Sequence, residues 1–92
     1  MTTFVVLGRY THASIKDISA ERTAAANEVV KGLGGEIISG YAMLGKHDLL
    51  IVVDFPSIEN AMKASIELSK LLGISFTTSP AVSMEEFDKL VG

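Results

Sequence analysis

The chain has 92 residues, which predicts a single small domain spanning residues 1–92, because typical domains contain about 100–200 residues. Its net charge is -3, so the chain does not produce the positive electrostatic field that attracts nucleic acids or anionic membranes. Neither is an expected partner. With no cysteine, the chain cannot form a disulfide framework, a thiolate metal site or a thiol nucleophile.

The N-terminal part of the chain predicts a strand followed by a helix. Thr3–Tyr10 is rich in β-branched and aromatic residues, as expected for a first strand. Thr11–Ser19 mixes turn-forming residues with a short helical turn, and Ser19 can cap a helix over Ala20–Gly32. The apolar side chains of this helix recur at helical spacing, so the helix is expected to lie on a core.

A β-hairpin is expected next. Glu36–Met43 and Asp48–Phe55 predict two strands that pair antiparallel. A two-residue turn at Gly45-Lys46 would place Leu44 opposite His47. A four-residue loop would give the same residue pairs further along the strands, so the sequence does not decide between the two connections.

The C-terminal part of the chain predicts a second helix, an edge strand and a terminal helix. Ser57 caps a helix over Ile58–Leu72, and Ile74–Val82 is an edge strand because Pro80 cannot donate to a neighbouring strand. Ser83 begins a short helix that ends near Leu90. The second helix is expected to bury a stripe of small and apolar side chains: Ala61, Met62, Ser65, Leu68, Ser69 and Leu72.

This element order predicts an α+β fold, a ferredoxin-like βαββαβ sandwich with a short C-terminal helix. Right-handed crossovers place both long helices on one face of a four-stranded antiparallel sheet, with the first and third strands central. These two strands are apolar on both faces, and the face without helices carries Val5, Leu7, Leu50 and Val52. Such a face is rarely exposed in monomers, so a homodimer or higher homo-oligomer is expected.

Neither a leader peptide nor a membrane-spanning segment is expected. The chain starts with an alternating segment, without a basic stretch followed by an apolar one. Its longest unbroken apolar run, Leu49–Val53, is far shorter than a bilayer span of about 20 residues. These features favour a cytoplasmic protein with no membrane partner.

Short motifs occur in a specific order between Phe4 and Leu90. They are Thr11, Glu21-Arg22, Gly34-Gly35, Tyr41, Leu44-Gly45-Lys46-His47-Asp48, Asp54-Phe55-Pro56, Pro80-Ala81 and Glu85-Glu86-Phe87. In this order they make the chain resemble the GYD domain family. The resemblance implies a ferredoxin-like fold of the dimeric α/β-barrel kind, in a family without an established biochemical role. The chain departs from the family pattern at His47, which stands where the family has a tyrosine before the aspartate.

A first candidate site lies where the hairpin meets the helices. The predicted register places Tyr10 and His47 on the helix side of the sheet, with His12 in the loop that follows the first strand. A mouth between helices and sheet can hold a small ligand, and His47 could transfer a proton near neutral pH. The alternative is structural: His47 caps the hairpin, and His12 is a solvated loop residue.

A second candidate site lies on the opposite, oligomer-facing side. There Arg9 and Asp48 are expected to pair across the first and third strands, with Tyr41 nearby on the second. The alternative is an ion pair that only fixes the register of the strands.

No metal and no cofactor are expected, because two histidines and Asp48 are too few donors for three or four convergent ligands. The favoured function is a small oligomeric α/β-barrel protein that binds a small molecule at the hairpin/helix mouth. The alternatives are a non-catalytic regulatory or structural oligomerisation module and a cofactor-independent monooxygenase- or isomerase-like enzyme. Fold analogy does not decide between them, so catalytic residues stay unassigned.

Overall fold

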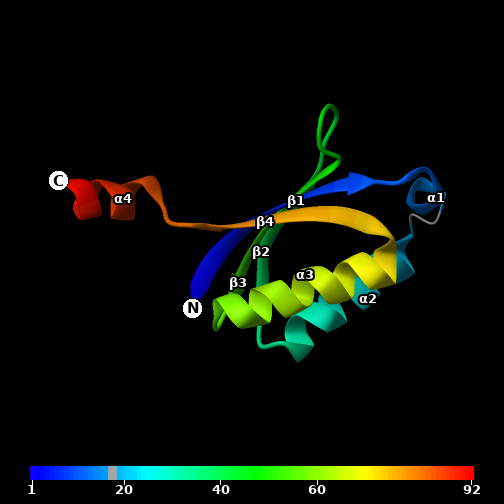
Figure 1. The fold of residues 1–92 in the computed structure, drawn as a ribbon, viewed down its shortest axis with the longest axis horizontal. Helices are drawn as coiled ribbons and strands as arrows, with labels where there is room; N and C mark the ends of the chain where they lie inside the picture. Colours follow the sequence, from blue (N-terminus) through cyan, green and yellow to red (C-terminus); the bar gives the residue numbers. More distant parts are fainter. Residues whose placement is uncertain (17–18) are drawn as a thin grey trace.

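The elements follow the predicted order in a computed structural model that describes residues 1–16 and 19–92 (Figure 1). The strands are β1 (Thr2–Tyr10), β2 (Glu36–Ala42), β3 (Leu49–Phe55) and β4 (Ile74–Ala81). The helices are α1 (His12–Ile15), α2 (Ala20–Gly32), α3 (Ile58–Leu72) and α4 (Met84–Val91). Part of the predicted turn over Thr11–Ser19, residues 17 and 18, lies outside the described residues.

The sheet has four strands in the order β2-β3-β1-β4, and each neighbouring pair is antiparallel. The strands β1 and β3 are therefore central and β4 is an edge strand, as predicted. The long helices α2 and α3 lie together on one face of the sheet (Figure 1). This is the expected ferredoxin-like βαββαβ sandwich.

Serine side chains begin the three longer helices at the predicted positions. Ser19 Oγ accepts a hydrogen bond from the Arg22 amide at 3.1 Å, and Ser57 Oγ accepts one from Asn60 at 3.2 Å. Ser83 caps α4 in the same way. Each such cap stabilises its helix by about 1 kcal/mol, so short-range sequence signals fix where these helices start.

The hairpin has the predicted register and the longer of its two predicted turns. Tyr41 pairs with Leu50, and the Met43 amide donates to the Asp48 carbonyl at 2.8 Å. The connection beyond this pair is a four-residue loop, 44–47. A bulge between Ile37 and Ser39 was not predicted; it leaves the side chain of Ile38 53% exposed.

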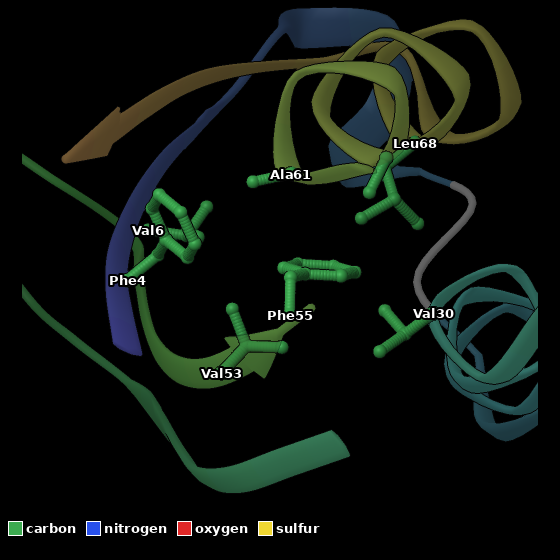
Figure 2. Packing of buried hydrophobic residues seen from close by; sticks show 8 residues of the cluster. Phe4, Val6, Val30, Val53, Phe55, Ala61 and Leu68 are labelled. Atoms are coloured by element: carbon green, nitrogen blue, oxygen red, sulfur yellow. The ribbon is translucent and has the colours of Figure 1, made fainter. Parts of the chain in front are cut away.

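The core fills the space between the sheet and the two long helices. Figure 2 shows Phe55 lying between β3 and the helices, with Val30 of α2 and Leu68 of α3 on its helix side. The Phe55 and Phe4 rings meet edge to face, with centroids 6.1 Å apart. This contact joins the two central strands on the helix side.

The buried stripe of α3 differs from the prediction at two positions: Met62, which was predicted, is exposed, and Ala64, which was not, is buried. Ala61, Ala64 and Leu68 are buried, whereas the Met62 side chain is 60% exposed. Met62 lies about 100° around the helix from Ala61, so the two side chains cannot both point to the centre of the core. The predicted serines lie on the flank: Ser65 hydrogen-bonds Thr78, which ties α3 to β4.

The C-terminal helix α4 projects away from the helical layer (Figure 1). All of its side chains are exposed, including the large apolar ones of Met84, Phe87 and Leu90. No helix in the described part of the chain is long and apolar enough to cross a membrane.

Gly35 is required by its contact with the core. A Cβ atom at Gly35 would lie 2.5 Å from Cε1 of the buried Phe55 ring and 2.9 Å from Val30 Cγ1. Gly35→Ala should therefore lower the free energy of unfolding by about 1–3 kcal/mol, measured by urea denaturation. At Gly32 an added Cβ would meet nothing within 4 Å, so Gly32→Ala is the control and should cost nothing. Equal effects of the two substitutions would contradict this account.

Candidate functional site

A cavity of about 400 Å³ lies between the sheet and the helices α2 and α3. Apolar side chains from every layer line it, including Val6 and Ile51 from the sheet, Ala26 and Val30 from α2, and Leu68 from α3. Well-packed interiors contain few voids larger than a water molecule. A cavity of this size falls in the range of small-molecule pockets, about 300–1,000 Å³.

Polar side chains gather at one end of the cavity. Tyr10 is the last residue of β1, and Ser19, Arg22 and Thr23 belong to the start of α2. Arg22, Ala26 and Val30 follow each other at a spacing of four residues, which places them on one side of the helix. The cavity therefore runs from a polar end beside Arg22 to an apolar end beside Val30.

The Arg22 guanidinium is the cation of this polar end. Its Nη1 donates a hydrogen bond to the Ser14 carbonyl oxygen at 2.7 Å, and its Cζ lies 5.6 Å from the centroid of the Tyr10 ring. This distance is within the range of a cation–π interaction. Among residues 1–16 and 19–92, no carboxylate lies within 4.0 Å of the guanidinium.

The short helix α1 holds the Ser14 carbonyl that Arg22 contacts. Thr11 and Ser14 cap each other reciprocally: the Ser14 amide donates to Thr11 Oγ1 at 3.0 Å and the Thr11 amide donates to Ser14 Oγ at 2.7 Å. Thr11 Oγ1 also donates to the Gly73 carbonyl at the end of α3. These bonds connect the polar end of the cavity to both long helices.

The three residues of the first candidate site separate in the structure. Tyr10 lines the cavity, whereas neither His12 nor His47 is among its lining residues. His12 is exposed on α1, and His47 is half-buried in the loop that precedes β3. The structure therefore brings Tyr10 together with Arg22, a residue that was named from the sequence only in the motif Glu21-Arg22.

The residues of the second candidate site are arranged around a backbone contact. Asp48 Oδ2 accepts a hydrogen bond from the Tyr10 amide at 2.8 Å, and the Asp48 amide donates to the Gly8 carbonyl. Arg9 is exposed, and within the described part of the chain it makes no ion pair with Asp48. The Asp48 carboxylate therefore binds the backbone amide of Tyr10 instead of the expected partner, the Arg9 side chain. Tyr41 is 61% exposed opposite Leu50.

The face of the sheet opposite the helices carries a central apolar strip. Val5 pairs with Val52 and Leu7 pairs with Leu50, so these four side chains share this face. All four are only half-buried within the chain. The adjoining edge strand β4 contributes Ser79 and Thr77 to the same face.

The described residues contain no group of three histidine, aspartate or glutamate side chains that could hold a metal ion. The candidate site is the cavity, with its apolar lining and the Arg22–Tyr10 pair at one end.

The sequence profile of the GYD domain matches residues 4–91 of this chain. The chain belongs to the GYD domain family. No curated protein matches this GYD domain significantly in sequence.

Solved structures of two regulators share the fold. An AsnC family transcriptional regulator from Agrobacterium tumefaciens is 23% identical, with a TM-score of 0.60, and the leucine response regulatory protein LrpA of Mycobacterium tuberculosis is 10% identical, with a TM-score of 0.59. Each alignment covers 90% of this chain and 51% of the other chain. This GYD domain thus spans about half the length of the regulators, and at these identities the likeness establishes the fold alone.

Proposed function

We propose that this GYD domain binds a small apolar molecule between its helices and its sheet, and that it works as a homo-oligomer. The single observation that carries the binding proposal is the cavity of about 400 Å³, with an apolar lining and polar groups at one end. Ligand pockets combine a mostly apolar wall with a few polar groups that orient the ligand. Arg22 and Tyr10 would supply that orientation.

The structural neighbours support a regulatory setting for this binding. Both are named as regulatory proteins, and one is named for its response to leucine. A shared fold does not carry function by itself, so the cavity remains the main support.

The open face of the sheet supports the homo-oligomer. Val5, Leu7, Leu50 and Val52 form an apolar strip that stays half-exposed in the described part of the chain. Two such sheets packing face to face would produce the dimeric α/β barrel that the family resemblance implies, and would remove both strips from water. The exposed apolar side chains of α4 favour association as well.

The binding proposal predicts the effect of filling the cavity. Ala26 lines it from α2, so Ala26→Phe should abolish the stabilisation of the domain by an apolar small molecule. A ligand at 100 times its Kd raises the free energy of unfolding by about 2.7 kcal/mol. This corresponds to roughly 10 °C or more in Tm for a domain of this size, which a thermal-shift screen detects easily.

The matched control is Ala24→Phe. Ala24 is exposed on the same helix and is not among the cavity-lining residues, so this variant should respond to ligand as the unsubstituted domain does. Equal responses of the Ala26 and Ala24 variants would place the ligand outside the cavity and contradict the proposal.

A second candidate function is a non-catalytic oligomerisation module, which the open apolar face of the sheet favours. In that case no small molecule would stabilise the domain, whereas association would persist. The same thermal-shift screen, combined with the mass in solution, distinguishes the two functions.

A further inference from the structure

The polar end of the cavity carries the positively charged guanidinium of Arg22, and this charge favours a ligand with a negatively charged group. We propose that the cavity takes an apolar monocarboxylate, with its carboxylate against Arg22 and its hydrocarbon part among Val30, Ile51 and Leu68. This inference rests on the proposed binding function and specifies the ligand of that same site.

The guanidinium of Arg22 has the donors that a carboxylate needs. It carries five N–H donors in a planar fork, which matches the two oxygens of a carboxylate. The hydrogen bond to the Ser14 carbonyl oxygen engages Nη1. In the described part of the chain no Asp or Glu pairs with this cation. Because Arg22 is partly buried, an anion that reaches it would be screened less by water than at an exposed arginine.

The rest of the lining favours a single negative charge over a zwitterion. No Asp or Glu of the described residues lines the cavity, and apart from Arg22 its polar lining residues are all neutral: Tyr10, Ser19, Thr23, Asn27, Tyr41 and Ser65. An ammonium group on the ligand would therefore lose water without gaining a carboxylate partner from the described residues. A fatty or aryl acid fits this charge pattern better than an α-amino acid does.

The volume limits the length of such an acid. Water occupies about 30 Å³ per molecule in the liquid, so a cavity of about 400 Å³ has room for about a dozen non-hydrogen atoms at that density. Octanoate is slightly smaller than this limit and is a suitable probe.

The experiment compares three probes of the same chain length, namely octanoate, octan-1-ol and 2-aminooctanoate, by isothermal titration calorimetry on the full chain. Octanoate should bind more tightly than octan-1-ol, and 2-aminooctanoate should bind more weakly than octanoate. Arg22→Gln should weaken octanoate binding about 10- to 100-fold, as expected for loss of a charged hydrogen bond, and leave octan-1-ol binding nearly unchanged.

Two further variants keep the result interpretable. Lys63→Gln removes the same charge from an exposed position on α3 outside the cavity and should leave all three affinities unchanged. If loss of the Ser14 contact unfolds the Arg22→Gln variant, Arg22→Lys retains the charge without the planar fork. This variant should still bind octanoate, but more weakly than the unsubstituted domain.

The outcomes separate the two proposals. If octanoate and octan-1-ol bind equally and the Arg22 substitutions change neither, the monocarboxylate inference is overturned while binding in the cavity stands. Tighter binding of 2-aminooctanoate than of octanoate would also overturn the inference. If none of the three probes binds, the proposed function itself fails and this inference with it.

Discussion

Replacing Phe55 with alanine is expected to lower the free energy of unfolding by about 3–5 kcal/mol. The Phe55 side chain is 2% exposed, meets the Phe4 ring edge to face and packs against Gly35. Its loss would join a new void to the cavity that is already present, and the surrounding side chains could collapse into that space only in part. Because small domains are stable by only about 5–15 kcal/mol, this substitution should leave a marginally folded chain.

Urea denaturation at one fixed protein concentration measures this effect, since association would otherwise add to the apparent stability. Phe55→Leu retains most of the volume and is the matched control, with an expected loss below about 1.5 kcal/mol. A loss below about 1 kcal/mol for Phe55→Ala would show that the ring does not organise the core.

The second large effect is expected on association. Leu50 lies at the centre of the apolar strip, opposite both Leu7 and Tyr41. Leu50→Asp would place a carboxylate where two sheets are proposed to meet, and a buried unpaired charge is strongly unfavourable. Association should weaken at least about 100-fold, equivalent to about 2.7 kcal/mol, while the monomer stays folded because Leu50 is only half-buried within the chain.

Sedimentation equilibrium and circular dichroism on the same samples test this prediction. Met62→Asp is the matched control, because it introduces the same charge at an exposed apolar side chain on the helix side of the molecule. If Met62→Asp dissociates the oligomer and Leu50→Asp does not, the interface lies on the helix side and the assigned face is wrong.

The fold was predictable because its determinants are local or periodic. Ser19, Ser57 and Ser83 mark helix starts through bonds to amides three residues on, and such caps need no tertiary context. Successive side chains of a strand point to opposite faces, so the consecutive apolar residues of β1 predict that both of its faces are apolar. The pairing of Val5 with Val52 agrees with this prediction. These signals also determine which strands are central.

A ligand-binding mouth between the helices and the sheet was expected from the sequence, but the volume and most of the lining of the cavity were not predictable, because they depend on how far the helices stand from the sheet. Ala26 of α2 and Ala64 of α3 are lining residues too small to fill the space between the layers. Sequence periodicity indicates that such residues face inward, but it does not indicate whether the opposite side chains reach them. The volume depends on how α2, α3 and the sheet pack together.

The roles of Arg22 and Asp48 were missed for different reasons. Arg22 stands in line with Ala26 and Val30 on the inward side of α2, and a charged residue at such a position is a signal of a partner or a ligand. For Asp48, the prediction considered side-chain partners only. The β1–β3 pairing ends at Gly8 and Leu49, so the Tyr10 amide, two residues beyond Gly8, is free to bind the carboxylate.

The most direct test of the binding proposal is a methyl NMR titration of the full chain with octanoate or octan-1-ol, whichever binds more tightly. The account predicts shifts for the methyl groups of Val30, Ile51 and Leu68, which line the cavity. The methyl groups of Val5 and Val52, on the opposite face of the sheet, should keep their positions. Shifts confined to Val5 and Val52, or no shifts with either probe, would contradict the assignment of the cavity as the ligand site.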